Sequence, residues 1–135
     1  IKNKQKLRKS VNEIINFTKK NNIKLALSTS TTINNVEAVF KSLSNQISKE
    51  DFHFIGNRSL VKNEKPNPEI YKLTLEKLNL EPDNCLAIED TEESSKSAVS
   101  AGIKCIGFPG DYHSDDSFEM CIKKVKILDQ SLFSL

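Results

Sequence analysis

Along the chain, segments whose hydrophobic residues repeat at helical spacing alternate with short apolar runs typical of strands. The first set repeats at helical spacing and predicts an amphipathic helix over residues 7–21; its members are Leu7, Val11, Ile14, Ile15 and Thr18. An apolar run over residues 23–27 predicts a short strand, which ends where hydroxyl side chains begin at Ser28. A second helical set predicts the next helix, with a cap from residues 31–35; its members are Val36, Val39, Phe40 and Leu43.

The middle of the chain repeats this order of strand and helix. Residues 52–55 predict a strand, and a polar loop follows as far as Lys65. Asn67, Pro68 and Glu69 predict the start of a helix that continues to Leu78, because Asn caps helices and Pro and Glu suit the first turn. Further along, a strand is predicted over residues 85–88, and a polar helix over residues 91–101 that Gly102 stops.

The last third of the chain completes an α/β pattern. Residues 103–108 predict a strand and residues 118–123 a weak helix, and a last apolar segment covers residues 125–128. The alternation of helix and strand indicates a parallel sheet. Because parallel strands end at one edge of their sheet, we expect the polar loops that contain Thr29, Lys65 and Asp90 to converge there.

Length and composition narrow the class of protein. The 135 residues fit a single domain, and 37% hydrophobic and 28% charged residues are typical of a soluble protein. A net charge of +2 argues against a dedicated polyanion binder, so we expect no nucleic-acid partner. Residues 2–9 are basic, but a solvated helix start is favoured over a nucleic-acid arm because no aromatic residues interleave with the charges. Without a membrane-length apolar run or a signal-peptide core, we expect a cytoplasmic protein with no membrane partner.

The three cysteines and two histidines do not form a recognisable ligand set. Cys85, Cys105 and Cys121 are irregularly spaced, which fits neither a disulfide framework nor a zinc site. Cys85 and Cys105 lie in apolar runs and are expected to be small core residues of a reduced protein. His53 and His113 have no partner at ligand spacing, so structural or solvated roles are expected for both.

Polar residues after three predicted strands suggest a common chemistry. The adjacent carboxylates Glu89 and Asp90 follow a buried strand, where Mg²⁺ would offset the cost of desolvating them. Thr29 and Ser30 provide hydroxyls near a helix start, which donate to phosphate oxygens. Lys65 can neutralise phosphate charge. Together these residues indicate a site for a phosphoryl group held by a metal ion.

Each of these residues also has a simpler interpretation. Thr29 and Ser30 could cap the following helix, and Lys65 could be an ordinary solvated lysine. The pair Glu89 and Asp90 could belong to the acidic first turn of a helix. The order of the three elements along an alternating α/β pattern is more specific than any one of them.

Three segments carry a resemblance that covers nearly the whole chain. They read Ile-Lys-Leu-Ala-Leu-Ser-Thr-Ser over residues 23–30, Lys-Pro-Asn-Pro-Glu-Ile-Tyr over residues 65–71, and Leu-Ala-Ile-Glu-Asp-Thr over residues 86–91, followed by Ala-Gly-Ile at 101–103. Together they resemble the haloacid dehalogenase superfamily, in particular its β-phosphoglucomutase-like phosphatases. The resemblance implies a Rossmann-like core with a parallel sheet.

The resemblance also implies roles for the site residues. Thr29 would bind the substrate phosphate, with Ser30 beside it, and Lys65 would balance the charge of phosphate and nucleophile. Glu89 and Asp90 would help to hold Mg²⁺. Lys65 and Thr29 are therefore the expected catalytic residues. The tail over residues 109–118 is most similar to members that act on sugar bisphosphates such as xylulose-1,5-bisphosphate.

Two parts of the family pattern have no match in this sequence. The family's nucleophile lies in an Asp-x-Asp-Gly motif on a central strand, and its cap domain follows that strand. We therefore expect residues 1–135 to be the C-terminal part of the core domain, truncated and inactive alone. The missing N-terminal segment of the same enzyme would then be a partner. Two strands, ending near Thr29 and Glu89, should lack the neighbour between them.

The expected function is Mg²⁺-dependent hydrolysis of a small phosphorylated metabolite, such as a sugar phosphate or bisphosphate. The resemblance implies an aspartyl-phosphate on an aspartate missing from this chain. Phosphoryl transfer of the β-phosphoglucomutase type is an alternative. A non-catalytic binding or assembly module is another. A receiver-like signalling domain is disfavoured because Asp90 follows Glu89 in a different motif context.

Overall fold

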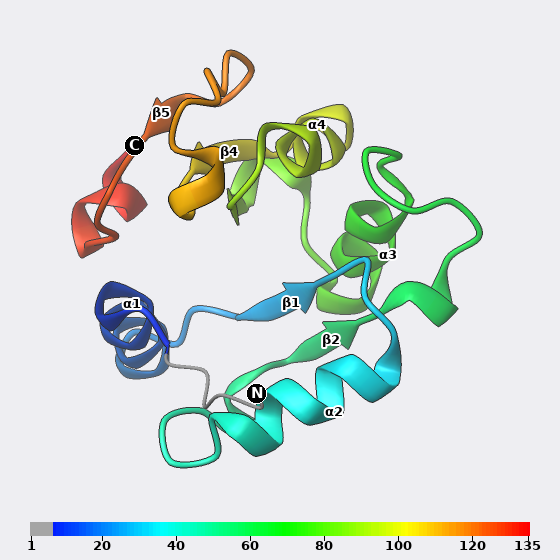
Figure 1. The fold of residues 1–135 in the computed structure, drawn as a ribbon, viewed down its shortest axis with the longest axis vertical. Coiled ribbons are helices and arrows are strands. Elements are labelled where there is room, and N and C mark those ends of the chain that lie inside the picture. The colour runs from blue at the N-terminus through cyan, green and yellow to red at the C-terminus, as the bar shows by residue number, and fades with distance from the viewer. Residues whose placement is uncertain (1–6) are drawn as a thin grey trace.

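The computed structural model describes residues 7–135, and helices and strands alternate along them as expected (Figure 1). The helices are α1 (Lys9–Lys20), α2 (Ile33–Ser42), α3 (Glu69–Leu78) and α4 (Glu92–Ser100). The strands are β1 (Ala26–Ser28), β2 (Phe54–Gly56), β3 (Leu86–Glu89), β4 (Lys104–Gly107) and β5 (Lys123–Lys124). Most predicted elements are confirmed to within three residues at each end. The basic residues 2–6 lie outside the described residues.

All strand pairs in the described chain are parallel, which confirms the α/β, Rossmann-like fold class. One sheet pairs β1 with β2, and the other has the order β3-β4-β5. In the structure of residues 7–135, β1 and β3 are not paired with each other. These are the two strands that were expected to lack the neighbour between them. None of the helices described is long and apolar enough to span a bilayer.

Local capping explains where the helices near the sheet edge begin. The Thr32 hydroxyl accepts a hydrogen bond from the Asn35 amide (3.3 Å) at the start of α2. At the start of α3, the side-chain oxygen of Asn67 accepts from the Glu69 amide (2.9 Å), and the helix begins one residue later than predicted. Because these caps lie directly after the loops that carry the polar residues, they fix the direction of those loops.

The predicted helix over residues 118–123 is wrong. Phe118 has a left-handed backbone (φ +51°), and the Cys121 amide closes a turn on the Phe118 carbonyl (3.0 Å). The Phe118 side chain is buried against Gly107, and the chain then pairs with β4 as β5. Burial of one aromatic ring and a strand pairing therefore outweigh a weak helical pattern. The segment over residues 125–128 buries Leu128 without forming a strand.

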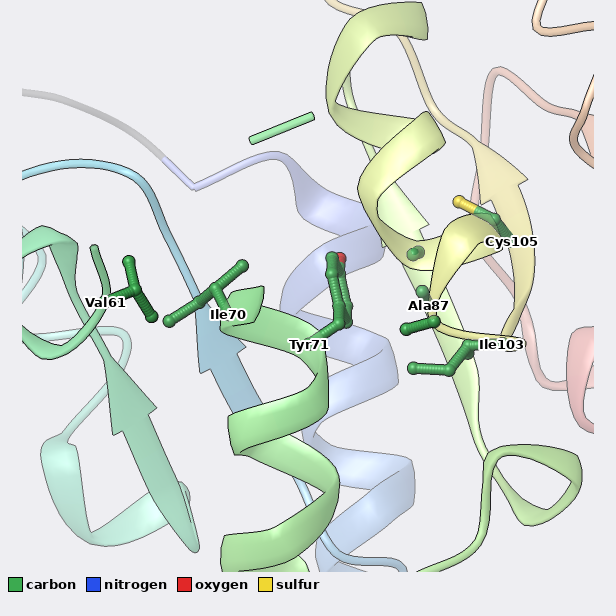
Figure 2. Close-up of a cluster of buried hydrophobic side chains, with 8 residues drawn as sticks. Val61, Ile70, Tyr71, Ala87, Ile103 and Cys105 are labelled. Carbon is green, nitrogen blue, oxygen red and sulfur yellow. The ribbon is translucent and has the colours of Figure 1, made fainter. Parts of the chain in front are cut away.

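Two helices hold the sheets together. In α1, Ile14 packs into a cluster with Ile106 of β4, whereas its neighbour Ile15 packs into a different cluster beside α2. In α3, Ile70 lies on the Val61 side of a buried cluster and Tyr71 on its Ala87 side (Figure 2). Both α1 and α3 thus contact both halves of the molecule.

Candidate functional site

A groove of about 1260 Å³ lies between β1 and β3. Its walls include apolar side chains of β1 and β3, and α1 and α3 also line it. Leu27 of β1 and Leu86 and Ile88 of β3 are only half-buried, although strands of an α/β sheet are ordinarily covered on both faces. The groove therefore exposes apolar surface where a buried sheet would have its centre.

The walls of the groove also carry unpaired backbone groups. Residues of a strand direct their N–H and C=O groups alternately to the two sides. The Thr29 amide bonds to the Gly56 carbonyl of β2, so the backbone of Ser28 faces the groove. On the other wall the Glu89 carbonyl accepts from Phe108, so the backbone of Ile88 faces the groove. Both walls thus present unpaired backbone donors and acceptors to the groove.

We expect hydrogen exchange to alternate along these two strands. In the described chain taken alone, the amides of Ser28 and Ile88 should exchange at least tenfold faster than those of Leu27 and Ala87, because only the latter face a paired strand. Exchange monitored by NMR measures this difference. Strand β4 is the control: a strand lies on each side of it, so its amides should show no such alternation. Equal protection of alternate residues in β1 and β3 would contradict this pairing.

The predicted phosphate-binding hydroxyls lie at the carboxyl end of β1, on the groove. Thr29 Oγ1 accepts a hydrogen bond from the Thr31 amide (3.1 Å), which leaves its own proton free to donate. Ser30 Oγ is buried and has no hydrogen-bond partner within the described residues. Ser28 Oγ is hydrogen bonded to Thr74 Oγ1 of α3 (2.7 Å). Because a buried hydroxyl without a partner is unfavourable, Ser30 suits a position next to a ligand oxygen.

Lys65 and Glu89 form a buried ion pair on the opposite side of the groove. Lys65 Nζ lies 2.5 Å from Glu89 Oε2, and the two side chains are 9% and 8% exposed. The Tyr71 hydroxyl donates a hydrogen bond to the same carboxylate oxygen. The structure therefore brings Lys65 and Glu89 into contact, as their predicted convergence required, and adds Tyr71 to them.

Sequence reasoning gave Tyr71 no role beyond its place in the family motif. Burial and the neighbouring Glu89 carboxylate raise the pKa of the Tyr71 hydroxyl well above its ordinary value, so it remains a donor. The ring belongs to the hydrophobic cluster in Figure 2, whereas the hydroxyl reaches Glu89. A tyrosine on an otherwise apolar helix face, six residues after Lys65, was the available signal.

Asp90 differs from Glu89 in its surroundings. Asp90 is exposed at the end of β3 and lines the groove, and it makes no hydrogen bond or ion pair with any residue in the described range. A nearby cation is Arg8, whose guanidinium stacks on the Phe108 ring (3.2 Å from its centre) and donates to the Phe108 carbonyl (3.1 Å). Burial lowers the pKa of Arg8, and the charges of Asp111 and Asp90 oppose that shift.

The carboxylates at this site are the type of ligand that a hard cation prefers, but they are too few to complete its coordination. Carboxylate oxygens suit Mg²⁺, which takes six oxygen ligands, several of them usually water or phosphate. Asp90 offers free oxygens, whereas one oxygen of Glu89 is bonded to Lys65 and Tyr71. No group of three His, Cys, Asp or Glu residues between 7 and 135 is placed to hold a metal ion. A cation here would need further ligands besides Asp90 and Glu89.

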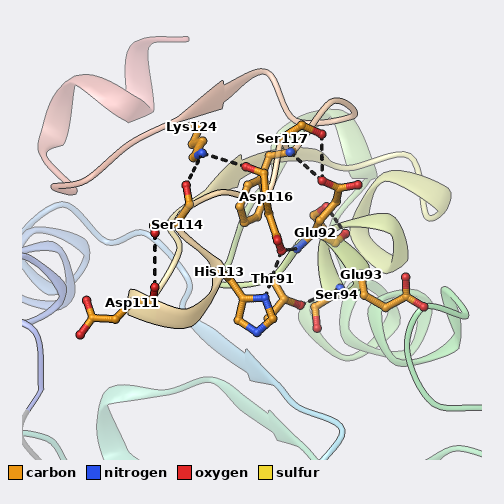
Figure 3. Close-up of polar contacts among 12 residues, drawn as sticks. Thr91, Glu92, Glu93, Ser94, Asp111, His113, Ser114, Asp116, Ser117 and Lys124 are labelled. Atoms are coloured by element: carbon orange, nitrogen blue, oxygen red, sulfur yellow. Dashed lines mark hydrogen bonds and ion pairs between the residues drawn. The ribbon is translucent and has the colours of Figure 1, made fainter.

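The loop after β4 folds back onto the start of α4, next to Asp90 in the chain (Figure 3). Glu92 accepts hydrogen bonds from the Phe118 amide (3.0 Å) and the Ser117 hydroxyl (2.9 Å), and these lower the pKa of its carboxyl group. Asp116 accepts from the Glu92 amide (3.2 Å), and Lys124 donates to the Asp116 carbonyl (2.8 Å). These bonds hold the loop in place beside the site.

The remaining candidates have structural contacts. His53 Nδ1 accepts from the Leu25 amide (3.1 Å), and His113 Nδ1 lies 3.1 Å from Asp116. Cys105 is fully buried in the cluster that includes Tyr71, and Cys85 packs against it. The core position expected of Cys105 is confirmed, whereas Cys85 is only partly buried at the edge of the cluster.

The sequence is similar to a known family and to curated relatives. A family model described as haloacid dehalogenase-like hydrolase matches residues 1–108. The chain is 34% identical over 112 residues to protein CbbY of Cereibacter sphaeroides, covering 83% of this chain and 49% of that protein. It is 41% identical over 97 residues to the phosphorylated carbohydrates phosphatase of Thermotoga maritima, covering 71% and 43%. The chain thus spans about half the length of the curated relatives it matches.

The structure is also similar to solved structures. A crystal structure of CbbY from Rhodobacter sphaeroides in complex with phosphate is similar with a TM-score of 0.86 and 30% identity, covering 93% of this chain and 56% of that chain. Another, in complex with xylulose-(1,5)bisphosphate, has a TM-score of 0.83 and 32% identity, covering 88% and 53%.

Proposed function

The chain belongs to the haloacid dehalogenase-like hydrolase family, and we propose that it forms the phosphate- and metal-binding part of a Mg²⁺-dependent phosphohydrolase. The proposed substrate is a small phosphorylated metabolite, of the sugar phosphate or bisphosphate class. The observation that carries the proposal is the groove itself. It brings an unpaired Ser30 hydroxyl and Thr29 to one side, and the Lys65–Glu89 ion pair with free Asp90 to the other.

Each residue has a distinct part in this proposal. Thr29 and Ser30 donate to oxygens of the phosphoryl group. Lys65, ion-paired with Glu89, balances negative charge that develops during transfer. Tyr71 positions Glu89 rather than touching substrate. Asp90 would hold Mg²⁺ with support from Glu89, and the ion would supply further charge neutralisation at the phosphate.

The attacking group is proposed to come from outside these 135 residues, which would then be the C-terminal part of a core domain. In the reaction, a carboxylate oxygen forms a bond to phosphorus while the bond to the sugar oxygen breaks, and water then hydrolyses the acyl phosphate. The sequence contains no Asp-x-Asp motif. A strand that fills the groove, parallel to β1 and β3, would pair their free backbone groups and deliver an aspartate between Ser28 and Glu89.

The test uses the full-length product of the gene, with Mg²⁺ and a panel of sugar monophosphates and bisphosphates. Release of inorganic phosphate is expected, and Lys65→Ala should lower turnover at least tenfold, because a charge-balancing group contributes on the order of 1 kcal/mol or more to the transition state. Asp90→Asn should raise the Mg²⁺ concentration required. Lys62→Ala is the control, since Lys62 is exposed in the same loop.

The results separate the alternatives. Transfer of phosphate between positions of the sugar, without release of inorganic phosphate, would indicate a mutase. Absence of any phosphoryl transfer over the whole panel would favour a non-catalytic module. Turnover of Lys65→Ala equal to that of the Lys62→Ala control would remove Lys65 from the site.

A further inference from the structure

Two cysteines far apart in the sequence meet behind the site. Cys105 lies in β4 with no exposed surface, and Cys121 lies just before β5, half-buried against the same hydrophobic cluster. The amide of Ile122, the residue after Cys121, donates to the Cys105 carbonyl (3.0 Å), so the two backbones are hydrogen-bonded neighbours. Figure 2 shows Cys105 in the same cluster as Tyr71, with Ala87 between the two in this view.

We propose that Cys105 and Cys121 are a peroxide-sensitive thiol pair, which oxidises to a reversible intramolecular disulfide. Cys121 precedes β5 and lies beside β4, one residue out of register with Cys105, which places the two Cα atoms at a separation that a disulfide can span. Such a bond would join β4 to the segment before β5. The loop that packs on Glu92 lies between the two cysteines, so the disulfide would close that loop covalently beside the site.

The difference in solvent exposure between the two thiols determines which one reacts first with peroxide. Cys121 is partly exposed and reacts first with hydrogen peroxide, whereas burial raises the pKa of Cys105 and keeps it protonated. The Cys121 sulfur forms a bond to one peroxide oxygen as the O–O bond breaks, and the departing hydroxide takes up the Cys121 thiol proton to form water. The Cys105 sulfur then displaces hydroxyl from this sulfenic acid, and its proton leaves with that hydroxyl as a second water. Two thiols are oxidised and one peroxide is reduced.

The sequence allows a sharp test by mass spectrometry. Trypsin cleaves after Lys104 and Lys123, so the peptide of residues 105–123 carries both thiols, whereas Cys85 lies in the peptide of residues 78–96. After treatment with stoichiometric peroxide, alkylation and digestion, peptide 105–123 should lose two hydrogen atoms. Dithiothreitol should restore them. Free thiols titrated in denaturant should fall from the three of the reduced chain to one.

Two variants and two outcomes decide the proposal. Cys121→Ser should abolish the loss of two hydrogens, and Cys85→Ser, which removes the third thiol, should leave it unchanged. Cys121→Ser is preferred to a change at fully buried Cys105, because it leaves the core intact. A cross-link between the two peptides, or stable oxygen addition at Cys121 with Cys105 free, would overturn the proposal. Tandem spectra distinguish the latter from oxidation of exposed Met120.

Discussion

Replacement of Lys65 by methionine is expected to lower the free energy of unfolding by about 3–5 kcal/mol at neutral pH. The change removes the cation that lies 2.5 Å from Glu89 and leaves a carboxylate buried with only the Tyr71 hydroxyl as partner. A buried charge without its counter-ion is strongly destabilising, whereas the intact pair contributes little net stability. Urea denaturation followed by circular dichroism measures the loss.

A double-mutant cycle separates the ion pair from the loss of the lysine side chain. Adding Glu89→Gln to the Lys65→Met variant removes the buried charge, so the double variant should regain most of the lost stability. Lys62→Met is the matched control; Lys62 is exposed in the same loop and should change the free energy by no more than about 0.5 kcal/mol. If Lys65→Met is no more harmful than Lys62→Met, the ion pair does not form in solution.

Gly107→Ala is expected to destabilise the protein by about 1–3 kcal/mol. A Cβ atom at this position would lie 2.5 Å from Cδ1 and 2.6 Å from Cγ of the Phe118 ring. The backbone of Gly107 cannot withdraw, because β4 is paired on both sides. The ring of Phe118 would therefore have to move, and with it the amide that donates to Glu92. Thermal and urea unfolding measure the effect.

Gly110 provides the comparison for this substitution. An added Cβ at Gly110 meets no atom within 4 Å, and the residue is exposed in the loop that follows β4. Gly110→Ala should therefore alter stability by no more than about 0.5 kcal/mol. If both alanine variants lower the free energy of unfolding equally, the effect comes from replacing glycine in general and not from the contact of Gly107 with Phe118.

The sequence was sufficient for the order of elements and for the convergence of Lys65 with Glu89. Reasoning from the sequence treated Glu89 and Asp90 as equivalent ligands. The structure distinguishes them, because Glu89 is ion-paired with Lys65 and Asp90 is exposed. Successive residues of a strand point to opposite faces. Glu89 therefore turns inward to Lys65 and Tyr71, whereas Asp90 remains exposed. The difference follows from the period of a strand and could have been predicted.

Other features depend on distant contacts that no local pattern contains. Phe118 adopts a left-handed backbone because its ring fills the space over Gly107, eleven residues earlier in the chain. The unpaired Ser30 hydroxyl is evident only once the packing around it is known. The meeting of Cys105 with Cys121 depends on the pairing of β5, a strand of two lysines that carries no apolar signal.

The facing strands of the groove also bear on the behaviour of the chain in concentrated solution. Unpaired strands with apolar side chains are templates for other polypeptides, and a net charge of only +2 gives molecules little mutual repulsion. Copies of the chain with an empty groove would therefore aggregate as their concentration rises. A strand that fills the groove would therefore keep the protein soluble by preventing association between copies, in addition to completing the proposed active site.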